Sequence, residues 1–430
     1  MKNKKTAYVI LFTIVFLDMV GFGIIIPLLP YYGQTFAGEI QQIGSFLGVS
    51  MAPEGLVIAV LFSVYSLMQF VFSPVWGRLS DRFGRRPVLL WNLFGSVLAY
   101  IIFGVAGSLF VLFLSRVIQG VAGAKIATAQ AYIADITPPE KRARGMGMIG
   151  AGLGLGFVFG PAIAGLLISL ESSLLDWAFL DSLLQHNIYS LPGYFAALLS
   201  LANLVVLYFL LPEPRERNIS KSGQRFRIWN WGELRSVLEH PQLGLLLLII
   251  FLATTAFSSM ESMFALWGES ALGIDEQTNS YLFAYIGVLI AINQGLIVGR
   301  LAEKIGEHRL IILGTGTLMV ALVLLPFSAT LWILMGVLAI LAFGSGVNTP
   351  SLQSLVSQTS HDSEVGGTMG LSQSTSSLAR IIGPLLGGWV YDLFGIQFPF
   401  IVGGLIMLVA FLLSWRLASG QTEFPLDTRG

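Results

Sequence analysis

Cysteine is absent from the 430-residue chain, and histidine occurs only four times. Without cysteine the chain has no disulfide, no thiolate nucleophile and no cysteine-ligated metal site. The histidines are all predicted to lie in loops between apolar segments; they are His186, His240, His308 and His361. We therefore expect no metal, no cofactor and no nucleophile–base pair, and hence no enzymatic activity.

Charged residues are also scarce. They make up 11% of the chain, whereas 55% of residues are hydrophobic. Soluble domains have roughly 25% charged residues. The composition predicts an integral membrane protein, with the lipid bilayer as its surroundings and no nucleic-acid partner. The first apolar segment contains Asp18 and is followed by Pro27 and Pro30 rather than by a small-residue cleavage site, which indicates a retained helix and not a removable signal peptide.

Long apolar runs account for most of the sequence. Runs of about 20 residues, the length that crosses a hydrocarbon core of roughly 30 Å, recur along it. Twelve are found, at 7–29, 55–77, 87–106, 109–133, 145–169, 192–212, 242–264, 279–299, 309–328, 331–354, 367–389 and 398–417. The sequence thus predicts an all-α integral membrane protein with twelve transmembrane helices.

Two short segments occur twice at nearly the same spacing. Gly77–Gly84 (GRLSDRFG) returns 222 residues later as Gly299–Gly306 (GRLAEKIG), and Gly160–Gly165 (GPAIAG) returns 223 residues later as Gly383–Gly388 (GPLLGG). Duplicated membrane bundles with a site near the bilayer midplane are typical of secondary transporters. We expect two pseudo-symmetric six-helix bundles, residues 1–212 and 242–430, around a central cavity.

Residues 213–241 are predicted to link the two bundles. Their basic residues, interleaved with Trp229 and Trp231, fit either a short amphipathic helix on the membrane surface or a disordered connector. The other sizeable loop, 171–191, has no readable function.

Basic residues are distributed unevenly between the two sides of the membrane. Of the 24 lysines and arginines, 21 fall in the N-terminal tail, the even-numbered connections and the C-terminal end, and none falls in the connections on the other side. By the positive-inside rule, we expect a multi-pass protein of the plasma membrane with both termini cytoplasmic.

Five charged residues remain inside the predicted spans and away from their ends: Asp18, Arg116, Lys125, Glu261 and Arg380. A charge at the bilayer centre costs at least roughly 2.5 to 3.5 kcal/mol, so each should face a cavity or a partner. Burial disfavours a charged carboxylate and a nearby cation favours it, which makes Asp18 a feasible protonation switch or, alternatively, a structural hydrogen-bonding group. Arg116 stays protonated, and either holds and releases a carboxylate or forms a static contact.

The remaining three charges have competing interpretations. Lys125 is expected either to bind an anionic group or to pair with Asp18. Glu261 is either an external gate or part of a cation site, and Arg380 is assigned to structure. Uncharged polar residues in the spans are weaker substrate-cavity candidates, because most intramembrane amides only join helices. These candidates are Gln69, Gln119, Asn293 and Gln294.

Two glycine-rich segments suggest moving parts. Gly147, Gly156, Gly160 and Gly165 surround Pro161 in the fifth span, which predicts a closely packed but bendable hinge. A nucleotide-binding loop is a poor alternative, because no strand precedes the segment and the glycine spacing does not fit. The second segment, 77–86, is predicted to be a loop in which Asp81 caps the next helix or meets the other half as a gating lock, or else simply a basic anchor. Its candidate residues are Gly77, Arg78, Asp81, Arg82, Gly84 and Arg85.

These motifs resemble those of the major facilitator superfamily. The 77–86 segment is similar to its signature between helices 2 and 3, and 116–120 (RVIQG) to its helix 4 signature. Gly147 to Gly165 resembles the helix 5 motif of its drug:proton antiporters, with Ala164 in place of one glycine, and 18–30 resembles the helix 1 motif of the twelve-helix antiporters that include tetracycline and multidrug exporters.

The resemblance implies a monomer that works by alternating access and exports its substrate against an inward proton flow. It implies gating roles for Asp81 and Arg82, proton coupling for Arg116, and a hinge at Gly160 and Pro161. Asp18 and Gln69 match positions near the site in the tetracycline exporters. Those exporters also carry acids in helices 3 and 9, where this chain has Ala99 and Leu318 near the matching positions. We therefore expect a substrate other than the tetracycline–metal chelate.

The combined hypothesis is a proton-coupled antiporter for multidrug efflux, which exports small amphipathic organic molecules. Asp18 carries or senses the proton, Arg116 sets its affinity and Glu261 is the reserve carrier. One alternative is a proton-coupled or exchange transporter of a metabolite such as a sugar or organic anion, with Lys125 and Arg116 binding the anion. A more distant alternative is a membrane receptor that binds a ligand without transporting it.

Overall fold

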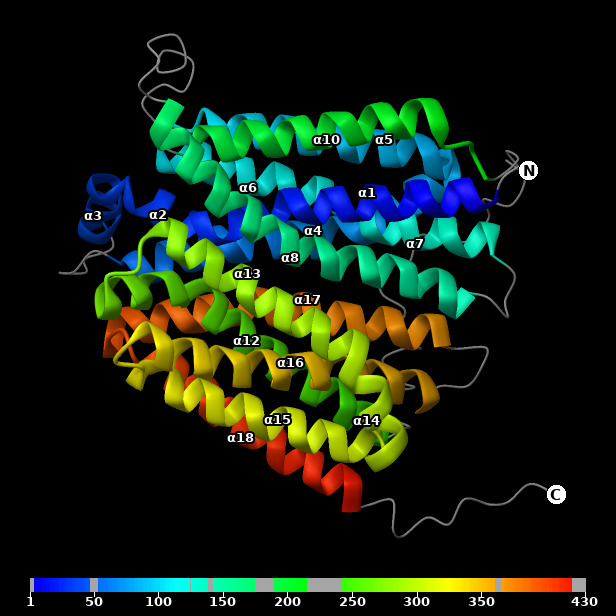
Figure 1. Cartoon of the computed structure of the whole chain (residues 1–430). Coiled ribbons are helices and arrows are strands. Elements are labelled where there is room, and N and C mark those ends of the chain that lie inside the picture. The colour runs from blue at the N-terminus through cyan, green and yellow to red at the C-terminus, as the bar shows by residue number, and fades with distance from the viewer. Residues whose placement is uncertain are drawn as a thin grey trace. The chain divides into compact units, whose positions relative to one another are not determined.

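The computed structural model describes residues 4–46, 53–123, 125–137, 142–174, 189–214, 241–359 and 365–419. Within these ranges the chain is helical and has no strand (Figure 1). Most of the predicted linker, including Trp229 and Trp231, most of the 171–191 insert, and His186, His240 and His361 lie outside them. His308 lies in the first turn of a helix, so its prediction as a loop residue was wrong.

The described residues divide into two compact units. Unit 1 contains the described residues up to 214 together with Ile274–Gly287; unit 2 contains 241–273 and 288–419. The helices through unit 1 are α1 (Lys4–Ile25), η1 (Ile26–Leu28), α2 (Leu29–Gln34), α3 (Ala37–Phe46), α4 (Glu54–Phe83), α5 (Arg85–Gly104), α6 (Leu109–Gly123), α7 (Lys125–Ile136), α8 (Arg142–Leu174) and α10 (Ser190–Leu210).

The remaining helices belong to unit 2, except for the first part of α13. They are α12 (Pro241–Leu272), α13 (Glu276–Ile292), the π-helix η4 (Asn293–Ile297), α14 (Val298–Ile305), α15 (Glu307–Leu324), η5 (Leu325–Phe327), α16 (Leu331–Thr359), α17 (Val365–Phe394) and α18 (Phe398–Ser419).

Two hydrogen bonds join Ile274–Gly287 to the rest of unit 1. The Tyr31 hydroxyl donates to the Ile274 carbonyl at 3.0 Å. The side-chain amide of Asn279 donates to the Pro27 carbonyl at 2.9 Å. Proline residues at 27 and 30 shape the η1–α2 turn that presents these groups. The compact unit therefore extends beyond the six helices of its own half of the chain.

Eleven helical segments of the described chain are long and apolar enough to cross a membrane. The twelfth predicted span, 367–389, lies in α17, a helix of 30 residues that does not meet this criterion. The reason is visible in its sequence: the first half is rich in serine and threonine, and Arg380 follows. The chain is an all-helical, multi-pass membrane protein.

The duplicated landmarks adopt the same local structure in both halves. Gly84 and Gly306 both have positive φ angles, +103° and +80°, and each separates two consecutive helices. A residue with a Cβ rarely adopts such angles. The second pair agrees, because Pro161 and Pro384 both lie inside long helices, α8 and α17.

The segment before Gly84 differs from the prediction. Residues 77–86 were expected to form a loop, but α4 continues through Phe83 and α5 begins at Arg85. The polar residues of this segment end the apolar run without ending the helix, so only Gly84 is non-helical. The short helix α3 was not predicted either.

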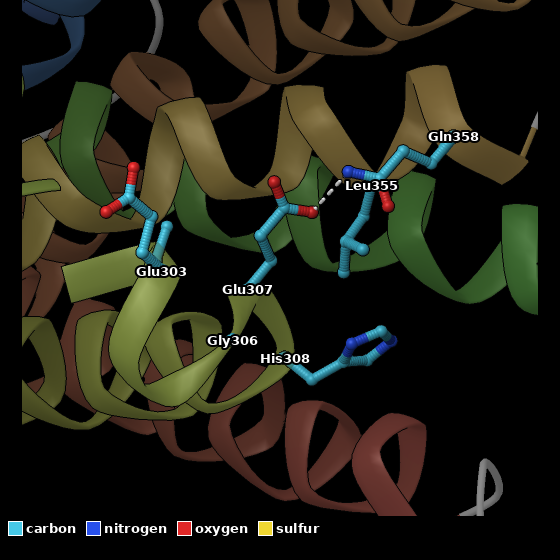
Figure 2. Close-up of a pocket in the computed structure, with 7 residues that line it drawn as sticks. Glu303, Gly306, Glu307, His308, Leu355 and Gln358 are labelled. Atoms are coloured by element: carbon cyan, nitrogen blue, oxygen red, sulfur yellow. Dashed lines mark hydrogen bonds between the residues drawn. The ribbon is translucent and has the colours of Figure 1, made fainter. Parts of the chain in front are cut away.

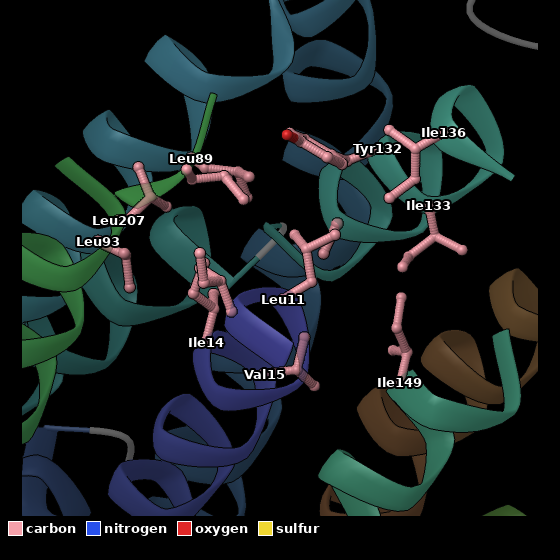
Figure 3. Packing of buried hydrophobic residues seen from close by; sticks show 13 residues of the cluster. Leu11, Ile14, Val15, Leu89, Leu93, Tyr132, Ile133, Ile136, Ile149 and Leu207 are labelled. Carbon is pink, nitrogen blue, oxygen red and sulfur yellow. The ribbon is translucent and has the colours of Figure 1, made fainter. Parts of the chain in front are cut away.

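Unit 1 has a hydrophobic core built by five of its helices (Figure 3). Leu11 and Ile14 of α1 contribute to it together with Leu89 of α5, Ile149 of α8 and Leu207 of α10, and all five side chains are almost completely buried. Four residues of α7, including Tyr132, complete the cluster. This packing fixes α1 against α5 and α7, the helices that carry the charged groups described below.

Candidate functional site

Asp18 and Lys125 form a buried ion pair in unit 1. Asp18 Oδ1 on α1 contacts the ammonium of Lys125, the first residue of α7. Lys125 Nζ also donates to Ser96 Oγ on α5 at 2.6 Å. Asp18 is 8% exposed and Lys125 is 2% exposed. Of the two partners considered for Lys125, the structure thus shows Asp18.

Arg116 on α6 is buried separately, with 1% of its surface exposed. Its guanidinium donates to Gln119 Oε1 and, at 3.5 Å, to the Leu61 carbonyl. It also lies over two aromatic rings, 5.0 Å from the centroid of Tyr65 and 5.9 Å from that of Phe22. A cation is attracted to such ring faces. Within the described chain Arg116 has no carboxylate in ion-pair distance, so its charge is balanced by oxygen dipoles and aromatic faces.

Tyr100 on α5 connects these two groups. It is 1% exposed, interacts electrostatically with Asp18 and Arg116, and its hydroxyl approaches the Gln119 side chain. Gly21 permits this position, since a Cβ there would lie 2.9 Å from the Tyr100 hydroxyl oxygen. Asp18, Tyr100, Gln119 and Arg116 therefore form one contiguous polar cluster.

No pattern in the sequence singles out Tyr100, Tyr65 or Ser96. Tyrosines in apolar helices are ordinarily belt or packing residues, and serines are frequent in membrane helices. Only the packing of α4, α5 and α6 around the two cations shows that these hydroxyls belong to the cluster.

The predicted amide candidates do not all join this cluster. Gln119 does, whereas the Gln69 side chain donates to the Gly123 carbonyl at 3.1 Å and so joins α4 to α6. Asn293 is buried at the start of the π-helix η4 in unit 2, and Gln294 beside it is exposed. For Gln69, Asn293 and Gln294 a role in substrate binding stays a prediction.

Unit 2 has its own pair of membrane charges. Glu261 on α12 is half-buried, and Arg380 on α17 lies close enough to interact with it electrostatically. These two helices pack extensively against each other. Glu261 thus has a cation of the same unit within electrostatic range, although the two form no ion pair in the described part of the chain.

The predicted gating segment contains an ionic network centred on Arg85. This arginine is 6% exposed and contacts Asp81 at 2.7 Å, Asp135 of α7 at 2.9 Å and Ser80 Oγ at 2.5 Å. Asp81 therefore pairs with Arg85 and is not the cap of α5. The cap is Glu213, whose carboxylate accepts the backbone N–H groups of Arg85 and Arg86 at 3.0 and 2.9 Å.

Two other arginines of this segment make contacts along α4 itself. Arg78 Nε donates to the Pro74 carbonyl one turn earlier at 2.9 Å, and the Arg82 guanidinium lies 5.4 Å from the Phe83 ring centroid. Gly77 is in the last part of α4, with open space around the position of a Cβ.

The predicted hinge lies in α8, which packs closely on α1. A Cβ at Gly160 would lie 2.6 Å from the Cα of Gly23, and one at Gly156 would lie 2.5 Å from the Met19 Cβ. At these two positions the helix backbones approach more closely than any side chain permits. Gly147, Pro161 and Gly165 lie in the same helix. The close packing is present, while bending stays a prediction.

A polar pocket of about 400 Å³ lies in unit 2 at the duplicated counterpart of the gating segment. Figure 2 shows Glu307 between α15 and α16, where it accepts hydrogen bonds from Ser354 Oγ and, at 2.8 Å, from Gln358 Nε2. Glu307 is 222 residues after Arg85. In both halves, the charged residue directly after the positive-φ glycine contacts a neighbouring helix. This residue is a cation, Arg85, in the first half and an acid, Glu307, in the second.

The sequence profile of the Major Facilitator Superfamily matches residues 11–327 and, again, 294–426. The chain belongs to the major facilitator superfamily. It is 30% identical over 390 residues to the tetracycline resistance protein, class B, of Escherichia coli, with 91% of this chain and 89% of the relative covered. It is 28% identical over 422 residues to multidrug resistance protein 2 of Bacillus subtilis (strain 168), with 96% of each covered.

Among solved structures, the chain is similar to the human organic anion transporter MFSD10. The TM-score is 0.71 and the sequence identity 25%, with 96% of this chain and all of that chain covered. The protein is therefore a membrane transporter of this superfamily, and proteins similar to it are named for both drug resistance and organic anion transport.

Proposed function

We propose that the protein is a proton-coupled antiporter that exports small amphipathic organic molecules across a bacterial plasma membrane, with both termini cytoplasmic. The observation that carries the proposal is the buried Asp18–Lys125 ion pair, linked through Tyr100 and Gln119 to Arg116. Burying two charges is costly because both lose their contact with water. Ionisable residues within membrane helices commonly mark transport pathways. The similarity to drug-resistance proteins over nearly the full length supports the same conclusion.

Protonation would act on the pair as follows. A proton on Asp18 removes the carboxylate charge and with it the ionic contact to Lys125. Of the two polar partners of Lys125, Asp18 and Ser96, the Ser96 hydroxyl would remain. The released ammonium and the neutral acid form a different binding surface from the intact pair, so proton and substrate would compete for the cluster.

Arg116 would serve as the fixed charge in this scheme, because its guanidinium keeps its proton. Its hydrogen bond to Gln119, and the neighbouring Tyr100 hydroxyl that interacts with both Gln119 and Asp18, connect it to Asp18. Loss of the Asp18 charge therefore changes the electrostatic surroundings of Arg116 directly. Glu261, with Arg380 beside it, would be a second proton carrier in unit 2.

Transport of an organic anion is the second candidate. Two buried cations, Lys125 and Arg116, lie in one unit with a single carboxylate, Asp18, in their cluster. An anionic substrate could replace Asp18 as the partner of Lys125. The similarity to an organic anion transporter favours testing this class.

The test uses purified protein in liposomes that contain a pH-sensitive dye. A pH gradient is imposed, and lipophilic cations, neutral drugs and organic anions are added in turn to the wild type and to Asp18→Asn. The matched control is Glu303→Gln, which neutralises an exposed acid in unit 2. Antiport predicts substrate-dependent proton movement that Asp18→Asn abolishes and the control retains. Substrate flux without proton movement would instead indicate anion exchange or uniport.

A further inference from the structure

An apolar groove lies on the surface of unit 1 between α5 and α10, which run side by side in Figure 1. Its volume is about 330 Å³, and all seven of its lining side chains are apolar or aromatic. Trp91 and Phe94 of α5, and Val205, Tyr208 and Phe209 of α10, are between 47% and 74% exposed. In a membrane such side chains contact lipid tails rather than water.

Arg86 lies at one end of this groove. It is in the first turn of α5, four residues before Leu90, which lines the groove. Its guanidinium donates to the Tyr208 carbonyl and lies 5.7 Å from the Tyr208 ring centroid. The cation is thus placed where the apolar lining ends.

A second arginine is connected to the same end through stacked side chains. The Arg82 guanidinium lies over the ring of Phe83, and that ring meets Trp91 edge to face with centroids 5.9 Å apart. Trp91 lines the groove. Two cations and a band of aromatic rings therefore border one end of an apolar hollow.

The nearby acids are engaged elsewhere. Asp81 and Asp135 pair with Arg85, and Glu213 accepts the two backbone N–H groups at the start of α5. Neither Arg82 nor Arg86 forms an ion pair with any residue in the described ranges. No carboxylate of the described residues therefore lies within ion-pair distance of either guanidinium.

We propose that the groove between α5 and α10 binds one acyl chain of an anionic phospholipid whose phosphate is held by Arg86 and Arg82. The volume is at the lower end of the roughly 300 to 1,000 Å³ typical of small-molecule pockets, which suits a single chain. Basic pockets between membrane helices on the cytoplasmic side bind anionic headgroups. The occupant comes from the leaflet at the end of α5 that carries the arginines, the cytoplasmic leaflet in the predicted orientation.

Charge preference is the first measurement. The purified full-length protein is incubated with phosphatidylglycerol or with phosphatidylcholine of identical chains, and retained lipids are counted by native mass spectrometry. The wild type should retain phosphatidylglycerol in preference. Arg86→Gln should lower that preference roughly fivefold, the contribution of one basic residue near an anionic surface. The matched control Arg309→Gln removes an exposed cation from the first turn of α15 and should leave the preference unchanged.

Filling the groove is the second measurement. Val205→Trp should reduce retention of the bound lipid, whereas Val409→Trp on α18 should not. The two valines are 47% and 48% exposed, so the substitutions are matched in exposure and size. Phosphatidylglycerol with a photoreactive chain should label the peptides containing Trp91 and Tyr208.

Three results would overturn the proposal: equal retention of the two lipids by the wild type, equal effects of Arg86→Gln and Arg309→Gln, or label spread evenly over all membrane helices. Each would mean that lipids surround the protein without occupying this groove. If Arg86→Gln is too poorly folded to purify, the Val205→Trp and Val409→Trp pair still decides the question.

Discussion

Removing the Asp18–Lys125 ion pair one charge at a time should destabilise the protein more than removing both charges together. Asp18→Asn leaves the Lys125 ammonium buried, with Ser96 as its polar partner. Lys125→Met leaves the Asp18 carboxylate in a site that is 8% exposed. Breaking a buried pair by removing one partner typically costs about 3 to 5 kcal/mol.

The double variant, Asp18→Asn with Lys125→Met, leaves no uncompensated charge. Replacing a buried ion pair by neutral residues of similar size is often close to neutral for stability. We therefore expect the double variant to be more stable than either single variant by ~2 kcal/mol or more. Unfolding in mixed micelles with increasing sodium dodecyl sulfate, followed by tryptophan fluorescence, measures these differences. If the loss of unfolding free energy in the double variant equals the sum of the two single losses, the two side chains do not stabilise each other. The ion pair would then not account for the burial of these charges.

Three further variants test other parts of the cluster and its packing. Tyr100→Phe removes a hydroxyl whose polar interactions contribute roughly 1 kcal/mol. The variant should fold, and its substrate-driven proton flux in liposomes should fall roughly fivefold. Unchanged flux would exclude Tyr100 from coupling. Gly160→Val places atoms against Gly23 and should cost about 1 to 3 kcal/mol in unfolding free energy, unlike Gly154→Val on the same helix, where a Cβ meets open space; equal losses would mean that the close approach is unimportant. Glu213→Ala removes the cap of α5 and should lower the unfolding free energy by about 0.5 to 2 kcal/mol, and an unaltered value would show that water replaces the carboxylate.

The duplication was the most reliable prediction from sequence, because it depends on local backbone requirements. Gly84 and Gly306 each mark a positive φ angle, which few other residues adopt, so the glycines remain recognisable after the flanking residues have changed. The buried charges were equally visible, since a charged residue within a long apolar run requires a partner. For Lys125 the sequence left two alternatives open, binding of an anionic group and pairing with Asp18, and the structure shows the pairing.

Contacts between distant parts of the chain could not be read in this way. Glu213 caps a helix that begins 128 residues earlier, and nothing in its local sequence indicates that role. Tyr100 looks like an ordinary aromatic residue until α5 is packed against α1 and α6. The helical continuation from Gly77 to Phe83 was missed because hydropathy marks where a span leaves the apolar pattern, not where its hydrogen-bonded helix ends.

Whether Asp18 exchanges a proton for substrate is tested most directly by measuring protons released when substrate binds to the purified protein in weakly buffered detergent solution. If proton and substrate compete for one cluster, substrate binding to the wild type should release protons, and binding to Asp18→Asn should release none. Substrate binding without proton release from the wild type, or equal release from the variant, would contradict the account.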